Sequence, residues 1–325
     1  MANIMITEAC NLQCPYCFAN EFVNKQSNYI SMEAFKTALD FIKSAADFDG
    51  RIGIIGGEPT VAPNFEEIMS LLINDISITS IAVYTNGVLV DKYLSFLANP
   101  KIDFLINLNS PEDIGEINYK RILDNIWALI KNGKISRIAL GINLYKEDQD
   151  VEYYIDALRQ FGIRHARVAI TTPNDCIVEL GFNRLRQLRK ELLKLTTRLM
   201  YENILFTVDC NRPPECIWNE EEQIKLEFIH KRKLNRKQYD NFFISKCNPV
   251  IDILPDLTAI RCFGLSGISK VNISDYKNID DLMKYYREVF DSEILTKPSS
   301  EECLTCKAFK SKTCYGGCLS NKRCY

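Results

Sequence analysis

The sequence predicts an α/β fold: six strand–helix units form a partial (β/α)6 barrel, and a small cysteine-rich domain with a β-hairpin and a helix follows. The first observation behind this prediction is that short β-branched runs alternate with amphipathic stretches over the first 200 residues, which favours a parallel sheet covered by helices. The second is that the alternation ends near residue 203, and seven of the 13 cysteines lie after residue 246.

The expected strands are short apolar runs, each followed by a helical pattern. The strands cover residues 3–7, 51–55, 80–85, 103–108, 137–143 and 165–170. The helices cover about 31–48, 64–74, 91–98, 118–132, 150–161 and 183–201. Ser31 is the expected N-cap of the first helix. Right-handed crossovers curl such a sheet into an open or closed barrel, whose ligands bind at the carboxyl ends of the strands.

We expect residues 1–205 to form the barrel and residues 206–325 to form a bridging region with the cysteine-rich domain. Pro213 and Pro214 interrupt the chain near this boundary. A hairpin is predicted over residues 250–260, with its turn at Pro255 and Asp256. One helix, at roughly 278–291, precedes the cysteine-rich tail.

Composition excludes several classes of protein. Hydrophobic residues make up 46% of the 325, so the chain should be globular, and a net charge of −2 argues against a nucleic-acid or membrane-surface protein. No apolar run approaches about 18 residues and no charged leader precedes the first strand, so we expect a cytoplasmic protein. Thirteen cysteines in a chain without a leader more often indicate metal sites than disulfides. The chain has only two histidines, which rules out most histidine-based metal sites.

Three cysteines stand on one loop directly after the first expected strand. Cys10, Cys14 and Cys17 have the spacing C-x3-C-x2-C. A structural zinc site or an electron-carrying cluster uses four cysteines. Three thiolates around a four-iron cluster would therefore leave one iron free to bind another ligand.

The second motif is Gly56-Gly57-Glu58-Pro59, at the end of the second expected strand. Two glycines let the backbone approach a ligand closely, and a carboxylate can bind an ammonium group. Alone, the tetrapeptide could be a simple turn. Placed one strand after the three-cysteine loop, it resembles the core motif of radical S-adenosylmethionine (SAM) enzymes.

The resemblance implies a [4Fe–4S] cluster on Cys10, Cys14 and Cys17, whose open iron binds SAM. It also implies SAM contacts at the carboxyl edge of the barrel. By position these are Tyr16 near the adenine, then Gly56, Gly57, Glu58, Pro59, Thr85, Asn107, Asn109, Asn143 and Val168. Many relatives carry Ser and Asp where this chain has Asn107 and Asn109. For the last four residues, a strand-end or packing role is the alternative.

The cysteines of the tail resemble a SPASM extension, which carries two auxiliary [4Fe–4S] clusters. Alone, residues 303–318 could instead form a zinc ribbon. The resemblance assigns a distal cluster to Cys303, Cys306, Cys314 and Cys324, and a nearer one to Cys247, Cys262 and Cys318. Cys216 is the expected fourth ligand of the nearer cluster, with Cys210 as the alternative. Cys176 is expected to be a small buried thiol, and Leu257 replaces a family glycine.

The resemblance also implies a reaction and a substrate class. A reduced cluster would donate one electron to SAM, and the resulting 5′-deoxyadenosyl radical would abstract hydrogen from an unactivated carbon. SPASM-type relatives mostly act on peptides or proteins. We therefore predict a maturase that forms a thioether or carbon–carbon crosslink in a ribosomally made peptide. A flavodoxin or ferredoxin is the expected electron donor.

Other functions remain open at this point. Sulfatase-type formylglycine maturases have an acidic residue after the second SPASM cysteine, and Phe263 disfavours that branch. The first strand begins at residue 3, so we expect a separate protein or the enzyme's own surface to recognise a leader peptide. A radical SAM enzyme for a small molecule and a non-enzymatic iron–sulfur or zinc protein are the alternatives. No catalytic base is identified; carboxylates and tyrosines at the barrel mouth are candidates.

Overall fold

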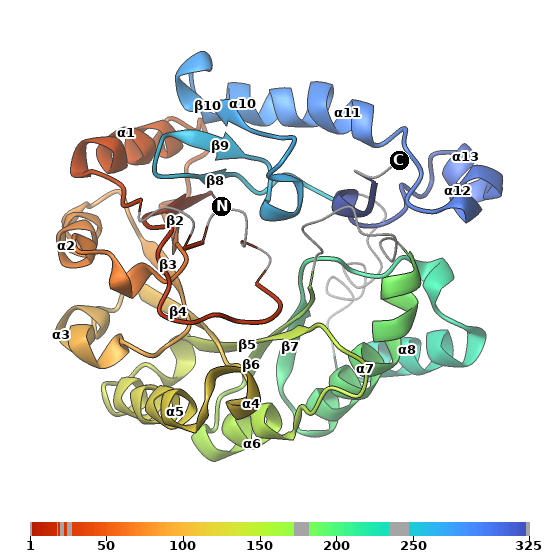
Figure 1. Cartoon of the computed structure of the whole chain (residues 1–325), viewed down its shortest axis with the longest axis horizontal. Coiled ribbons are helices and arrows are strands. Elements are labelled where there is room, and N and C mark those ends of the chain that lie inside the picture. The colour runs from red at the N-terminus through yellow and green to blue at the C-terminus, as the bar shows by residue number, and fades with distance from the viewer. Residues whose placement is uncertain are drawn as a thin grey trace.

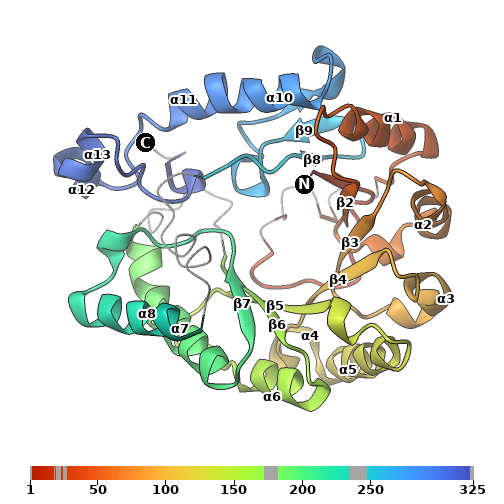
Figure 2. The same ribbon diagram turned by 180° about the vertical axis from the view of Figure 1, so that it is seen from behind.

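The fold is a curved sheet with helices around its outside, shown in Figure 1 as a computed structural model. The structure describes residues 2–17, 19, 23–24, 28–171, 182–233 and 247–322. The strands of these residues form one sheet in the order β10-β9-β8-β1-β2-β3-β4-β5-β6-β7. The sheet curls into a partly open barrel, as the view from behind also shows (Figure 2). Cys176 and Cys324 lie outside the described residues.

The six predicted strands are confirmed, and the sheet continues beyond them at both edges. The strands are β1 (Asn3–Met5), β2 (Arg51–Ile55), β3 (Ser80–Thr85), β4 (Ile102–Asn107), β5 (Ile138–Leu144), β6 (His165–Ile170), β7 (Leu205–Val208), β8 (Asp252–Ile253), β9 (Thr258–Ile260) and β10 (Val271–Asn272). β7 pairs in parallel with β6, and β8 pairs in parallel with β1. The predicted boundary at residues 205 and 206 falls inside β7, and the two-domain division stays a prediction.

The helices follow the predicted alternation. They are α1 (Met32–Lys43), α2 (Phe65–Asn74), α3 (Leu94–Leu97), α4 (Pro111–Ile114), α5 (Glu116–Lys131), α6 (Glu152–Phe161), α7 (Phe182–Tyr201), α8 (Glu220–Lys233), α10 (Ile279–Tyr285), α11 (Asp291–Ile294), α12 (Glu301–Thr305) and α13 (Lys307–Lys310). Ser31 caps α1 by accepting a hydrogen bond from the Ala34 N–H. In the described part of the chain, no helix has the length and apolar character needed to span a membrane.

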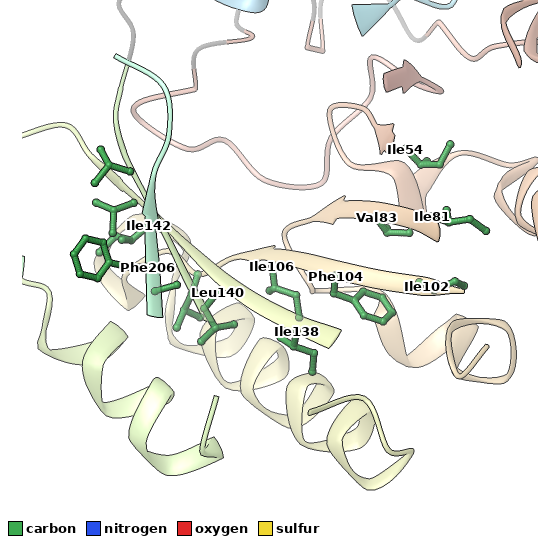
Figure 3. Close-up of a cluster of buried hydrophobic side chains, with 14 of the residues drawn as sticks. Ile54, Ile81, Val83, Ile102, Phe104, Ile106, Ile138, Leu140, Ile142 and Phe206 are labelled. Carbon is green, nitrogen blue, oxygen red and sulfur yellow. The ribbon is translucent and has the colours of Figure 1, made fainter. Parts of the chain in front are cut away.

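Side chains alternate between the two faces of the sheet, and the outer face carries the hydrophobic core. Ile54, Val83, Phe104 and Leu140 are buried there, between strands and helices (Figure 3). Their neighbours along each strand point to the inner face, where Tyr84 on β3 packs against a second hydrophobic cluster that includes Met5 and Ile55. Because the helices seal the outer face, the inner face and the carboxyl ends of the strands are left to bind ligands.

The C-terminal segment returns to the sheet as the predicted hairpin. β8 and β9 pair antiparallel, and β10 adds to β9. Leu257, in the turn of this hairpin, has a φ of 66°, in the left-handed region that favours glycine, the residue that the resemblance implies at this position. The predicted helix over 278–291 is α10 followed by a π-helical turn, Tyr286–Phe290, and α11.

Candidate functional site

The loop after β1 carries three thiols and crosses the interior of the ring of strands (Figure 1). Cys10, Cys14 and Cys17 are all partly buried. Burial, with a smaller contribution from charge on neighbouring groups, raises the pKa of Cys10 to about 11 and of Cys14 to about 12. Without a positive counter-charge these thiols therefore keep their protons. Iron supplies that charge when thiolates bind a cluster, so the donor set fits the expected one.

Amide side chains from two neighbouring strand ends surround these thiols. Asn109 Nδ2 donates to Cys14 Sγ at 3.3 Å, so its amide hydrogen bonds to a cysteine rather than standing free for SAM. Asn86 Nδ2 lies 4.0 Å from Cys10 Sγ and donates to Asn11 Oδ1 at 2.7 Å. Asn86 was not predicted as a site residue, although its place directly after β3 was a usable signal.

The glycine turn after β2 packs against the cysteine loop. The Gly57 N–H donates to the Thr7 carbonyl at 2.8 Å, and the Glu58 N–H donates to the Ala9 carbonyl at 2.9 Å. Gly56 also lies close to Thr7, since a Cβ at position 56 would be 2.9 Å from the Thr7 carbonyl oxygen. Larger residues would therefore separate the turn from the thiols.

Glu58 is fully buried and joins the ends of two strands. Its carboxylate accepts hydrogen bonds from Thr60 N and Oγ1, from Thr85 Oγ1 at 2.7 Å and from Asn86 N at 2.6 Å. Burial raises its pKa, and these hydrogen bonds act against the rise. This arrangement differs from the predicted direct contact with an ammonium group, because protein donors enclose the carboxylate. Glu58 and Thr85 instead hold the turn in place, and Pro59 behind Glu58 is buried as well.

The inner wall of the barrel offers a polar atom that lacks a protein partner. Among the described residues, Asn107 Oδ1 is buried and makes no hydrogen bond. Tyr16 packs against Tyr145 with ring centroids 4.8 Å apart, and a hydrogen bond with the Asn143 side chain opposes the rise that burial causes in the pKa of Tyr16. An unpartnered amide oxygen fits a polar ligand such as SAM. Val168 is the exception among the predicted contacts.

Val168 is fully buried on β6 and belongs to the core between sheet and helices. Its side chain therefore points away from the barrel interior, and the prediction of a SAM contact through this side chain is corrected. The preceding residue, Arg167, faces inward. Its Nε lies 3.0 Å from Asp209 Oδ2 and its Nη1 donates to Asn143 Oδ1 at 3.0 Å. Position along a strand could not show which of the two neighbours faces the ligand.

A second group of cysteines, the near group, consists of Cys210, Cys247, Cys262 and Cys318. Burial raises the pKa of Cys210 well above its usual range, and Asp209, Cys318 and Cys262 raise it further. Cys262, whose pKa burial raises to about 12, is also influenced by Cys318 and Cys247. The four thiols are therefore mutual electrostatic neighbours beyond the end of β7.

A third group, the distal group, contains Cys303, Cys306 and Cys314, with Cys216 beside them. Burial raises the pKa of Cys216 to about 11, and the three other thiols add to the rise. Cys210, the alternative ligand, therefore lies with the near group, and Cys216, the first choice from the sequence, lies beside the distal group. This placement favours Cys210, and the choice of ligand stays a prediction.

Two contacts hold the loop over 210–216 next to the segment that carries Cys318. Asn321 Nδ2 donates to Asn211 Oδ1 at 3.0 Å in the interior. A Cβ on Gly317 would be 3.1 Å from Pro214 Cδ. The chain on either side of Cys318 is therefore packed against this loop.

In the described ranges, no three histidine, cysteine, aspartate or glutamate side chains gather closely enough to bind one metal ion directly. The cysteine groups are neighbours rather than closed single-ion sites. An iron–sulfur cluster places its own irons and sulfides between the thiolates, so this donor chemistry fits clusters.

The family model of the radical SAM superfamily matches residues 4–158, from β1 into α6. Residues 4–158 are a radical SAM domain. The chain is 27% identical over 164 residues to the GTP 3′,8-cyclase of Alkaliphilus oremlandii. The match covers 47% of this chain and 50% of that protein. The chain thus spans about half the length of this curated relative.

Solved structures resemble the radical SAM domain and the segment after it. Streptococcus suis SuiB, solved with S-adenosylmethionine bound, has a TM-score of 0.63 at 18% identity. The superposition covers 98% of this chain and 73% of SuiB. Native anSMEcpe with bound AdoMet has a TM-score of 0.64 at 17% identity, with 98% and 88% covered. At such identities the likeness concerns the fold, and it extends over nearly the whole described chain.

Proposed function

We propose that this chain is a radical SAM maturase that abstracts hydrogen from a peptide or protein and forms a thioether or carbon–carbon crosslink. The observation that carries the proposal is the joining of Cys10, Cys14 and Cys17 to the Gly56-Gly57 turn at one end of a barrel. The match of residues 4–158 to the radical SAM superfamily supports the same reading.

The residues of the barrel would hold and orient the cofactors. Cys10, Cys14 and Cys17 would ligate a [4Fe–4S] cluster. When reduced and with SAM bound, that cluster would supply one electron, which breaks a carbon–sulfur bond of SAM and gives methionine and the 5′-deoxyadenosyl radical. Asn107 would bind a polar group of SAM through its unpartnered amide oxygen, and Asn143 would hold Tyr16 in place for SAM.

The two other cysteine groups would hold auxiliary [4Fe–4S] clusters. Cys210, Cys247, Cys262 and Cys318 form a complete set of four for the near cluster. Cys303, Cys306 and Cys314 would hold the distal cluster, with Cys324 as the fourth ligand expected from the sequence. Such clusters can accept or pass single electrons, over potentials of roughly −700 to +450 mV.

The peptide substrate is supported by the fold. SuiB, whose fold matches 98% of this chain, has also been solved bound to the precursor peptide SuiA. The chain contains cysteine groups well beyond residue 158, where the family model ends. A separate leader-recognition protein and a flavodoxin or ferredoxin as electron donor complete the proposed partners.

A small-molecule reaction is the second candidate. The GTP 3′,8-cyclases of Alkaliphilus oremlandii and Desulforamulus reducens match this chain at 27% and 30% identity. The matched parts cover 47% and 39% of this chain, and 50% and 40% of the two cyclases.

The test is to incubate reduced, reconstituted enzyme and SAM with a short peptide encoded beside the gene, and separately with GTP. The proposal expects a peptide that has lost two hydrogens per crosslink, and no such peptide with the C10A/C14A/C17A variant. SAM cleavage with an unshifted peptide mass would overturn the peptide assignment. GTP turnover would favour the second candidate.

A further inference from the structure

The near group of cysteines contains a buried guanidinium that the proposed function does not use. Arg261 stands directly before Cys262, and its side chain is 0% exposed. Its Nη1 donates to Cys247 Sγ at 3.6 Å, and its Nη2 donates to the Cys247 carbonyl oxygen at 2.9 Å. One side chain thus holds the sulfur and the backbone of a proposed cluster ligand.

Asp291 binds the same guanidinium from the other side. Arg261 Nε donates to Asp291 Oδ1 at 2.6 Å, and Nη2 donates to Oδ2 at 2.9 Å. The Asp291 side chain is 1% exposed, so water screens neither charge. Deep burial makes such a pair weak evidence for stability, because apolar residues of similar volume would often serve as well. The pair therefore calls for another explanation.

A π-helical turn brings Asp291 to this position. The Asp291 N–H donates to the Tyr286 carbonyl and closes the turn Tyr286–Phe290. Because an i→i+5 turn brings residues five apart to the same side, Tyr286 and Asp291 both face inward. The Tyr286 hydroxyl lies 2.8 Å from the Ser269 carbonyl, and the Arg261 N–H donates to Ser269 Oγ. Local backbone geometry thus locks both members of the pair.

We propose that the Arg261–Asp291 pair sets the reduction potential of the near auxiliary cluster. This inference rests on the proposed function, since it requires an iron–sulfur cluster on the near group. Hydrogen bonds to ligating sulfurs and nearby charge tune the potentials of such clusters. Arg261 stabilises the reduced, more negative state through its positive charge and its donor to Cys247. Asp291 limits this effect by balancing the charge.

The two partners act with opposite sign, which defines two variants. D291N keeps the size of the side chain and one of its two acceptors and removes the negative charge, so the positive charge of Arg261 is no longer balanced and the midpoint potential should rise. R261M/D291L removes both charges and the donor to the sulfur of Cys247, so it should lower the midpoint. Replacing both partners together avoids leaving one buried charge unpaired.

The experiment is an EPR-monitored redox titration of the reconstituted full chain in the C10A/C14A/C17A background. The near cluster is identified as the signal that C262A abolishes, and the distal signal is the internal reference. We expect D291N to increase the ratio of reduced to oxidised near cluster at least tenfold at the wild-type midpoint, which corresponds to about 59 mV. R261M/D291L should shift the ratio in the other direction.

D103N is the matched control. Asp103 pairs with Arg137 at 2.9 Å at the amino ends of β4 and β5, away from the carboxyl edge, and D103N should leave both midpoints unchanged. The inference would be overturned if the midpoint potential of the near cluster stayed fixed in both variants, or if it shifted with the same sign in both. Failure of either variant to assemble the near cluster would overturn it as well. A wild-type chain without a near signal would instead overturn the cluster assignment in the proposed function.

Discussion

Gly57 lies so close to Ala9 that a Cβ at position 57 would be 2.4 Å from the Ala9 carbonyl oxygen and 3.0 Å from Cys10 Cβ. Hydrogen bonds from the same turn join it to the cysteine loop. The glycine motif and the three thiols are therefore one packed unit. A side chain at position 57 must move the loop that carries Cys10.

G57A should therefore disrupt the N-terminal cluster. We expect the iron content to fall from about twelve to about eight per chain, because each [4Fe–4S] cluster contributes four irons. Iron and sulfide analysis of the reconstituted protein measures this loss. G133A is the control, since Gly133 has a φ of 79° and nothing within 4 Å of a built Cβ. It costs stability through strain, yet should keep all three clusters. Equal iron loss in both variants would contradict the packing argument.

C210A should remove the near cluster, whereas C216A should leave it in place. The reason is that Cys210 neighbours Cys318 and Cys262, whereas Cys216 neighbours the distal thiols. EPR spectra of the reduced variants, together with iron counts, distinguish these outcomes. A near signal that survives C210A and disappears in C216A would restore the ligand first expected from the sequence.

E58Q should destabilise the radical SAM domain by about 1–3 kcal/mol. The reason is that the NH2 group of glutamine would face the N–H and O–H donors that now bind the buried carboxylate. The lost acceptor faces Thr60, Thr85 and Asn86, and the turn should loosen, so that SAM binding weakens as well. Urea unfolding and SAM titration measure the two effects. E67Q, at an exposed residue of α2, should change the free energy of unfolding by less than about 0.5 kcal/mol. If E58Q and E67Q have the same free energy of unfolding and the same affinity for SAM, the Glu58 carboxylate does not bridge the two strand ends as argued.

Asp252 should make the stability depend on pH. Burial raises its pKa to about 7, and a hydrogen bond of 2.6 Å from Asn3 Nδ2 opposes the rise. Between about pH 4 and pH 7 the native state therefore holds a proton that the unfolded state has released, so stability falls as the pH rises.

D252N removes this titration. The variant should equal the wild type near pH 4 and exceed it above pH 7 by up to about 4 kcal/mol, since one pKa unit is worth about 1.4 kcal/mol. Urea unfolding at a series of pH values measures the difference. A stability difference that does not vary with pH would show that Asp252 does not titrate in this range.

The sequence predicts the barrel well because hydrophobic periodicity directly reflects burial. The six core strands and the hairpin of β8 and β9 follow this pattern. β7 is only four residues long, Leu205–Val208, and its alternation is too short to distinguish from a loop. Leu257 could be recognised from the resemblance, and its positive φ supplies the physical reason.

The site was predictable in its ligands and less so in its geometry. Cys210 and Cys216 are six residues apart, and their spacing alone could not show which of them lies near Cys262 and Cys318. The side of β6 on which Val168 lies depends on register. Arg261 was missed because a donor to a sulfur atom leaves no spacing pattern in the sequence, whereas the place of Asn86 directly after β3 was a signal that could have been used.

The most direct test of the central claim is the formation of 5′-deoxyadenosine by the reduced, reconstituted chain. The wild type should cleave SAM and contain about twelve irons, whereas C10A/C14A/C17A should contain about eight irons and form no 5′-deoxyadenosine. A triple variant that cleaves SAM at the wild-type rate, or a fully loaded wild type that cleaves none, would contradict the account.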